Sequence, residues 1–211
     1  MPLIFDTYET GDRLSLWHLT ETVEQLESNA SLSPNELLTY KQISNTKRKK
    51  EWLTVRLLLK EILGFWPDIS YLETGRPILN NHPLNLSISH SQEMVGVLLL
   101  TSEHTGIDIE KKTRPIENVL PRFLSTCERS YLNNCTVPNA KIISWCAKEA
   151  IFKAVDETDI DFSTRILIDE INTNGTIKGK FLSNNGDISF NLKHIEVKDH
   201  VVVWTSKTTK S

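Results

Sequence analysis

The chain has few cysteines and no long apolar run. Its 211 residues include only three cysteines, and no two of them have CxxC spacing, so neither a disulfide framework nor a zinc knuckle is indicated. No apolar stretch approaches the roughly 18 residues of a membrane span. The start, MPLIFDTYETGDR, lacks the basic residues and uninterrupted apolar core of a secretory signal. We therefore expect a cytoplasmic globular protein with reduced thiols and no membrane association.

Positive charge is also scarce overall. The net charge is −3 and the pI is about 6.1, so the surface as a whole offers nucleic acid no general attraction. One basic run stands out, Lys47-Arg48-Lys49-Lys50. Most of these charges are expected to be solvated at the start of a helix, with one or two facing a polyanion.

The pattern of apolar residues predicts an α+β protein of two related halves. Helices are expected over 22–28, from Pro34 onward, over 46–63 with a stop at Gly64, over 116–133 and over 140–155. Strands are expected over 14–19, 69–72, 77–79, 84–89, 94–100, 105–110, 165–171, 176–182, 188–197 and 201–205. Each half runs from a strand through helices to a strand-rich meander, so we expect two lobes, 1–103 and 104–211, with a frayed tail at 207–211.

Two acids stand on one face of the predicted strand in Gly106-Ile107-Asp108-Ile109-Glu110. Because side chains alternate along a strand, both carboxylates leave from the face opposite the isoleucines. Mg²⁺ prefers such oxygen ligands. The plainer alternative is a solvated strand whose acids are neutralised by the lysines that follow, Lys111 and Lys112.

A third acid and a lysine lie one helical turn apart in the predicted helix 140–155. Glu149 and Lys153 share a face, away from the apolar stripe of the helix. A Glu/Lys pair at this spacing is commonly an ordinary surface pair. Only its combination with the two strand acids suggests a site for a metal and a diphosphate.

Two further segments carry groups that suit a phosphate. The strand Asn85-Leu86-Ser87-Ile88-Ser89-His90-Ser91 ends in hydroxyls and an imidazole. The turn Thr74-Gly75-Arg76-Pro77 presents a guanidinium, which can bind phosphate through two parallel hydrogen bonds. Each of these features alone is commonplace at a protein surface.

Together, these segments resemble the motifs of the 4′-phosphopantetheinyl transferases. The match comprises GIDIE at 106–110, Trp145-Cys146-x-Lys148-Glu149-Ala150-x-x-Lys153, and the segments around Ser89-His90 and Gly75-Arg76-Pro77, in the expected order. Length and organisation resemble the larger, surfactin-type class, in which one chain forms two similar lobes related by pseudo-twofold symmetry. The resemblance implies a pseudo-dimer within a single chain, and we expect a monomer.

The resemblance implies a reaction and its partners. Coenzyme A would donate 4′-phosphopantetheine to a serine hydroxyl of an apo acyl or peptidyl carrier protein, with Mg²⁺ as the metal. The products would be the holo carrier and adenosine 3′,5′-bisphosphate. The carrier can belong to fatty acid, polyketide or nonribosomal peptide biosynthesis, and the sequence does not choose among them.

The resemblance also implies roles for residues. The metal-binding acids would be Asp108, Glu110 and Glu149, and Lys153 would contact the phosphates and protonate the leaving group. The residues that would bind the coenzyme are Arg48, Arg76, Ser89, His90 and Lys153. In the basic run, Lys47 or Lys49 can take the place of Arg48.

Three alternatives stay open from the sequence. Glu149 can ligate the metal directly, can take the proton from the carrier serine through a water molecule, or can do both. A metal-dependent nucleotide hydrolase could use the same acids without any carrier protein. A degenerate lobe that only binds coenzyme A or a carrier would be expected to have lost an acid or the lysine, and Asp108, Glu110, Glu149 and Lys153 are all present.

Overall fold

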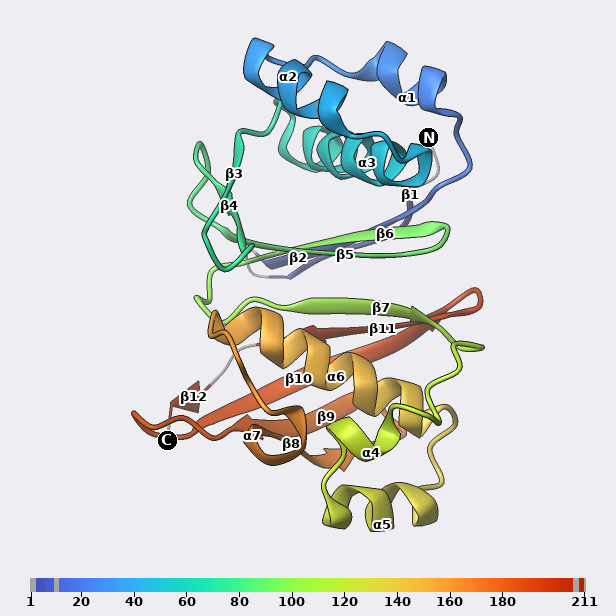
Figure 1. Cartoon of the computed structure of the whole chain (residues 1–211), viewed down its shortest axis with the longest axis vertical. Helices are drawn as coiled ribbons and strands as arrows, with labels where there is room; N and C mark the ends of the chain where they lie inside the picture. Colours follow the sequence, from blue (N-terminus) through green and yellow to red (C-terminus); the bar gives the residue numbers. More distant parts are fainter. Residues whose placement is uncertain (1–2, 10–11, 207–208, 211) are drawn as a thin grey trace.

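The computed structural model describes residues 3–9, 12–206 and 209–210. The first part of the chain forms a four-stranded antiparallel sheet in the order β1-β2-β6-β5. Its strands are β1 (Leu3–Glu9), β2 (Asp12–His18), β5 (Asn85–Ser91) and β6 (Met94–Leu100). The helices α1 (Val23–Asn29), α2 (Pro34–Gln42) and α3 (Thr46–Leu63) lie above this sheet, and a small hairpin, β3 (Ile69–Tyr71) with β4 (Pro77–Leu79), lies at its side (Figure 1).

A second antiparallel sheet forms below the first. Its order is β7-β11-β10-β9-β8, and β12 (Thr209–Lys210) also pairs with β10. The strands are β7 (Ile107–Lys111), β8 (Ile166–Ile171), β9 (Thr176–Phe181), β10 (Ile188–Val197) and β11 (His200–Thr205). The long helix α6 (Ala140–Val155) covers this sheet, and the short helices α4 (Leu120–Phe123), α5 (Thr126–Asn134) and α7 (Phe162–Arg165) lie beyond it (Figure 1).

The two sheets face each other across an apolar layer. This inter-sheet core consists of Leu14, Leu16, Met94, Leu98, Leu100, Ile107, Ile109 and Val202, all buried. Opposite faces of the same strands pack against the helices: in β6, for example, Val95, Val97 and Leu99 belong to the cluster beneath α3. A strand that is buried on both faces must be apolar at every position, which explains the unbroken run Met94–Leu100.

Most predicted elements are confirmed, because their boundaries carry strong local signals. Ser33 and Asn45 cap α2 and α3 with side-chain hydrogen bonds. Gly64 ends α3 with a positive φ of 78°, a conformation that glycine adopts without strain. The chain is thus a mixed α/β protein with antiparallel sheets. The predicted lobe boundary at residue 103 falls between β6 and β7, and the pseudo-twofold relation stays a prediction.

Four expectations were wrong in detail. Strand β1 was not predicted. The helical stretch 116–133 is broken into α4 and α5, because Ser125 starts a new helix with its own capping box. The strand predicted over 165–171 begins one residue later, because Arg165 ends α7, a short helix that was not predicted. In the predicted frayed tail, Thr209 and Lys210 pair with β10, whereas 207, 208 and 211 lie outside the described residues.

Two expectations about what the chain lacks can be compared with this structure. The cysteines at 127, 135 and 146 are all free thiols. Among the described residues, no helix is both long and apolar enough to cross a membrane.

Candidate active site

The candidate site begins where the two sheets meet at β5 and β7. Strand β7 is an edge strand, and on its open side two serine hydroxyls of β5 take the place of a neighbouring strand's carbonyls. The backbone N–H of Ile107 donates to Ser87 Oγ (3.1 Å), and that of Ile109 donates to Ser89 Oγ (3.1 Å). The two strands therefore run side by side in parallel, which sets Ser89 next to Asp108.

Asp108 and Lys153 form the centre of the site. Asp108 is 6 % exposed, and its Oδ1 accepts hydrogen bonds from Ser89 Oγ (3.1 Å) and Lys153 Nζ (2.8 Å). Lys153 also donates to the carbonyl of Ile107 at 2.9 Å. The second oxygen, Asp108 Oδ2, is buried without a hydrogen-bond partner. Since buried acceptors are normally satisfied, this oxygen is available to a further donor or a cation.

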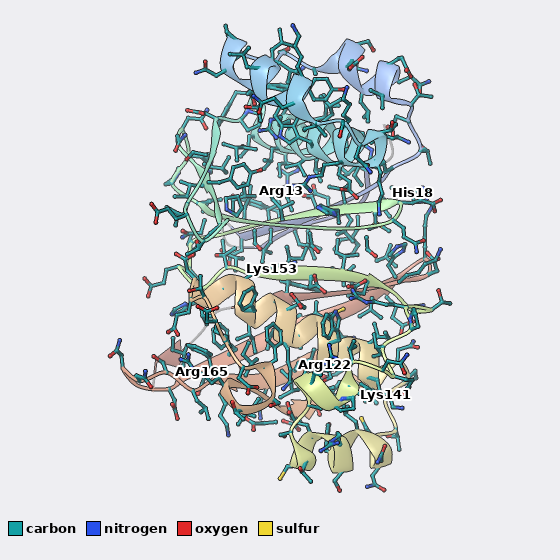
Figure 2. All side chains as sticks on the ribbon, viewed as in Figure 1. Arg13, His18, Arg122, Lys141, Lys153 and Arg165 are labelled. Atoms are coloured by element: carbon teal, nitrogen blue, oxygen red, sulfur yellow. The ribbon has the colours of Figure 1, made fainter. Side chains whose placement is uncertain are left out.

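A glycine permits the approach of α6 to β7. A Cβ added to Gly106 would lie 1.9 Å from the carbonyl oxygen of Ala150, a position that no side chain can occupy. The predicted apolar face of α6 is confirmed, since Ile143, Ala147 and Ile151 are fully buried. The motif glycine thus lets α6 lie close to β7. Lys153 of this helix lies next to that strand (Figure 2), within 2.8 Å of Asp108 Oδ1.

Glu149 is the acid with the most perturbed ionisation. Burial, reinforced by the negative charge of Asp108, raises the pKa of Glu149 to about 7, and the charges of Lys153 and Arg114 oppose the shift. Within the described residues Glu149 makes no hydrogen bond or ion pair. A carboxylate with a pKa near neutrality can accept or release a proton at physiological pH.

Glu110 is held differently from the other two acids. It forms an ion pair with Arg114, and its Oε1 accepts a hydrogen bond from Trp145 Nε1 at 3.3 Å. The lysines expected to neutralise the strand acids do not do so. Lys111 pairs with Asp199 and Lys112 with Glu196.

The described part of the chain contains no group of three His, Cys, Asp or Glu side chains arranged to hold a metal ion. The residues fit a divalent cation in part. Asp108 offers an unsatisfied buried oxygen, and the charge of Asp108 raises the pKa of Glu149, as expected for carboxylates in close proximity. Glu110 is engaged by Arg114 and Trp145. The donor chemistry suits a hard cation, with Asp108 and Glu149 as the better placed pair.

The predicted phosphate-binding residues line two adjoining cavities beside this centre. Arg48 and His90 line one of about 160 Å³, where Arg48 Nη1 lies 2.7 Å from His90 Nε2. Arg76 and Lys153 line the other, also of about 160 Å³. Both cavities are bordered by Gly75, Pro77 and Ile88. The structure therefore places four of the five predicted coenzyme-binding residues around two cavities that share part of their lining.

The fifth residue, Ser89, is buried and engaged by protein groups on all sides. It donates to Asp108, accepts from the Ile109 amide and lies 3.3 Å from Lys153 Nζ. In this structure its hydroxyl therefore orders the acid and the lysine. Lys47 is the alternative to Arg48. Its Nζ lies 3.7 Å from Oε1 of Glu51, a residue that lines the cavity of Arg48 and His90.

Sequence reasoning missed four residues of this region. The first is Asp156, which faces the predicted Arg76 (3.9 Å), whose guanidinium also donates to the Glu103 carbonyl (2.6 Å). The others are Glu51, beside His90, Arg114, on Glu110, and Lys148, fully buried in α6. Only Arg114 carried a local signal, because it stands four residues after Glu110. The remaining contacts join segments that are distant in sequence.

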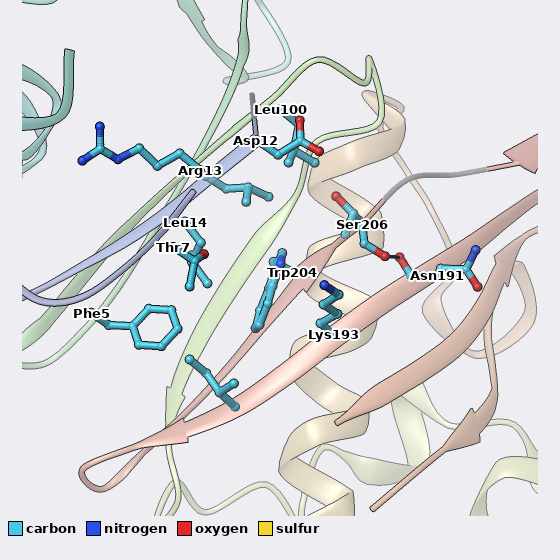
Figure 3. Close-up of a pocket in the computed structure, with 13 residues that line it drawn as sticks. Phe5, Thr7, Asp12, Arg13, Leu14, Leu100, Asn191, Lys193, Trp204 and Ser206 are labelled. Atoms are coloured by element: carbon cyan, nitrogen blue, oxygen red, sulfur yellow. Dashed lines mark hydrogen bonds between the residues drawn. The ribbon is translucent and has the colours of Figure 1, made fainter. Parts of the chain in front are cut away.

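Other cavities contain few of these residues. One of about 520 Å³ lies between the two sheets, where Phe5, Leu14, Leu100, Lys193 and Trp204 border it (Figure 3), and it includes none of the predicted residues. Another of about 620 Å³ is walled by Phe123, Trp145 and Phe162 and reaches Glu149. The convergence of charged groups thus singles out the junction of β5, β7 and α6.

Comparison with known proteins finds similarity in the second half of the chain. Residues 104–205 match the profile of the 4′-phosphopantetheinyl transferase superfamily. The chain is 36% identical over 72 residues to a 4′-phosphopantetheinyl transferase AcpT of Salmonella typhi, covering 34% of this chain and 37% of the relative. It is 38% identical over 64 residues to the AcpT of Escherichia coli K12, covering 30% and 33%. These matches span little more than a third of the length of the relatives. Residues 104–205, slightly less than half of the chain, are therefore similar to the 4′-phosphopantetheinyl transferase superfamily.

Proposed function

We propose that this protein transfers the 4′-phosphopantetheine moiety of coenzyme A to a serine hydroxyl of an apo acyl or peptidyl carrier protein. The observation that carries the proposal is the convergence of Asp108, Lys153 and Glu149 beside two cavities with basic walls. Transfer of a phosphoryl-linked group from a diphosphate needs positioned charges and a group that can exchange a proton. Here these would be the Lys153 ammonium, the buried oxygen of Asp108 and the Glu149 carboxyl group with its pKa near 7.

In this reaction one phosphorus–oxygen bond forms and another breaks. The serine oxygen of the carrier attacks the β-phosphorus of coenzyme A, and the bond from that phosphorus to the bridging oxygen breaks. Adenosine 3′,5′-bisphosphate leaves with the bridging oxygen. Lys153, whose ammonium lies 2.8 Å from Asp108 Oδ1, would stabilise the charge on that oxygen and supply a proton to it. Glu149 would take the proton of the serine hydroxyl, because its pKa near 7 leaves about half of it ionised at neutral pH.

Magnesium is part of the proposal. Asp108 and Glu149, joined by Glu110 if Arg114 releases it, would hold Mg²⁺, and the bound ion would neutralise charge on the diphosphate. Glu149 would therefore act as a ligand of Mg²⁺ or as the base for the carrier serine, and an experiment that varies pH and Mg²⁺ separates the two roles.

The coenzyme would lie along the two cavities. Arg48 and His90 at one end and Arg76 and Lys153 at the other supply the positive charge that its phosphates need. Ser89 would hold Asp108 and Lys153 in position through its hydroxyl group.

We further propose a monomeric cytoplasmic enzyme with two lobes, 1–103 and 104–211, related by pseudo-twofold symmetry. Its macromolecular partner would be the carrier protein, with no role for nucleic acid or a membrane.

The decisive experiment is to incubate the purified chain with coenzyme A, Mg²⁺ and several apo carrier proteins, and to weigh each carrier by mass spectrometry. We expect a gain of one phosphopantetheine group on at least one carrier. Asp108→Ala should abolish the gain, whereas Asp187→Ala, at an exposed position just before β10, should leave it unchanged. No gain on any carrier would contradict the proposal, and release of phosphate from nucleotides without a carrier would favour the hydrolase.

A second experiment separates the roles of Glu149. Transfer by Glu149→Gln is measured across pH and Mg²⁺ concentration. A base role predicts a loss that excess metal does not repair, together with loss of the pH dependence near 7. Full rescue by excess Mg²⁺ would assign Glu149 as a ligand only.

A further inference from the structure

A buried carboxylate with no assigned role lies beside the predicted phosphate-binding residues. The side chain of Glu51, on α3, is only 5 % exposed and borders the cavity that Arg48 and His90 line. Its Oε1 is buried and has no hydrogen-bond partner. Ionised groups are seldom buried without hydrogen bonds because desolvation is costly, so this carboxylate requires an explanation.

Three basic groups surround Glu51, and none binds it closely. Lys47 Nζ lies 3.7 Å from Oε1, and Arg48 Nη1 lies 3.7 Å from Oε2. The shortest approach, 3.3 Å, is between Oε1 and His90 Nδ1. Glu51 therefore supplies the central negative charge of a basic cluster, and its free acceptor points at the imidazole.

The contacts of His90 define which ring nitrogen is protonated. Arg48 Nη1 lies 2.7 Å from His90 Nε2. A guanidinium can only donate, so Nε2 is the acceptor and the ring hydrogen resides on Nδ1, the nitrogen that lies 3.3 Å from Glu51 Oε1. A carboxylate on one nitrogen of an imidazole commonly fixes the tautomer and the orientation of the ring.

We propose that Glu51 is a positioning residue for phosphate recognition, holding the Nδ1 side of His90 so that Nε2 and Arg48 face an incoming phosphate of coenzyme A. This inference rests on the proposed function. When the phosphate binds, Arg48 turns to it, and Nε2 takes up a proton from solvent and donates a hydrogen bond to a phosphate oxygen. Glu51 then stabilises the resulting imidazolium.

The charges around His90 make Glu51 necessary for this protonation. Burial lowers the pKa of His90, and the charges of Arg48, Lys153 and Lys47 lower it further. Glu51 is the group that opposes them. Without the carboxylate, the pKa of His90 would be lowered further, and a neutral imidazole attracts a phosphate less strongly than an imidazolium does.

The proposal and simple charge counting predict opposite changes in the affinity for coenzyme A when Glu51 loses its charge. Removal of a negative charge from a basic cluster would strengthen the binding of an anion if only net charge mattered. Positioning by Glu51 predicts that binding becomes weaker. The affinity of one variant therefore discriminates between the two.

The test is isothermal titration of coenzyme A into the full chain, without a carrier protein. We expect Glu51→Gln to weaken binding about tenfold, as loss of a residue that orients a ligating imidazole commonly does. Glu61→Gln, at an exposed position of the same helix, should bind like the wild type. Titration in two buffers of different ionisation enthalpy should show proton uptake on binding by the wild type and less uptake by Glu51→Gln.

A double-mutant cycle identifies the route of the effect. In a His90→Ala background, Glu51→Gln should cause little further loss. Unchanged or tighter binding by Glu51→Gln, or a full additional loss without His90, would overturn the proposal. Glu51→Asp, which keeps the charge but withdraws it from the ring, provides the same comparison if Glu51→Gln does not fold. Failure of the wild type to bind coenzyme A would instead contradict the proposed function.

Discussion

Two adjacent residues of α6 show how burial separates a structural charge from a reactive one. Lys148 is fully buried, and its ammonium group is satisfied by four protein acceptors. These are the carbonyls of Phe123, Phe162 and Ile166 and the carboxylate of Glu128. Glu149, the next residue, is largely buried and forms no hydrogen bond with the residues that the structure describes, and its pKa rises to about 7. Lys148 thus stabilises the packing of α6, whereas Glu149 is able to exchange a proton near neutral pH.

The raised pKa of Glu149 predicts a pH-dependent cost to stability. Between the ordinary carboxyl value of 4.5 and about 7, the folded protein binds more protons than the unfolded chain, so stability falls as the pH rises through this window. Glu149→Gln removes the titration and should be more stable than the wild type at pH 8 by about 1–3 kcal/mol.

This prediction is checked by urea unfolding in the presence of EDTA at pH 4 and pH 8. At pH 4 the wild-type carboxyl group is protonated in both states, and the two proteins should have similar free energies of unfolding. Parallel pH profiles for the two proteins would contradict the assigned shift.

Lys148 predicts a large loss of stability on substitution. Lys148→Met keeps the apolar stem but removes the cation that pairs with the buried carboxylate of Glu128 and the donor that serves three carbonyls. Breaking a buried pair in this way costs about 3–5 kcal/mol. Lys141→Met, in the same helix at a side chain that is 42% exposed, should cost less than about 1 kcal/mol. Equal losses for the two variants in urea unfolding would show that the Lys148 contacts contribute little.

At the scale of elements, local signals were sufficient for the helices and not for the site. The bounds of α3 and α6 were predicted because caps, a terminal glycine and apolar periodicity all act within a few residues. The acids of β7 were found because alternation places Asp108 and Glu110 on one face. Glu51 and His90 are far apart in sequence, and no local pattern joins them. Strand β1 was missed since it is an edge strand with mixed polarity, and its pairing with β2 depends on the rest of the sheet.

The packing of α6 on β7 depends on one glycine. Gly106→Ala would place a Cβ 1.9 Å from the carbonyl oxygen of Ala150, so strand and helix must separate. We expect a loss of about 3 kcal/mol or more in the free energy of unfolding, as for severe overpacking. Transfer should fall as well, because Lys153 would move away from Asp108.

The control for this prediction is Gly64→Asn. Nothing lies within 4 Å of a Cβ at Gly64, and asparagine tolerates the positive φ at a helix end. The variant should lose no more than about 1 kcal/mol. A Gly106→Ala protein as stable as this control would show that strand and helix adjust without cost.

At the scale of the molecule, the candidate site depends on both sheets. Ser89 belongs to the first sheet and Asp108 to the second, and their hydrogen bond crosses the junction. The inter-sheet core continues beneath them with Leu16, Leu98 and Val202, none of which is more than 1 % exposed. If the two sheets separated, this apolar layer would be exposed to water and the hydrogen bond between Ser89 and Asp108 would be lost at the same time. The geometry of the site is therefore linked to the stability of the whole fold.

This linkage predicts that the two sheets unfold as one unit. Leu98→Ala, in β6, leaves a cavity in the inter-sheet core and should cost about 2–5 kcal/mol. If the layer couples the sheets, native-state hydrogen exchange will show the same loss of protection in β6 and in β11, although the substitution lies only in the first sheet. Leu38→Ala, at a side chain that is 63% exposed, should change neither strand. Loss of protection in β6 alone would mean that the second sheet folds independently, and the site would then be formed only when two separately stable units dock.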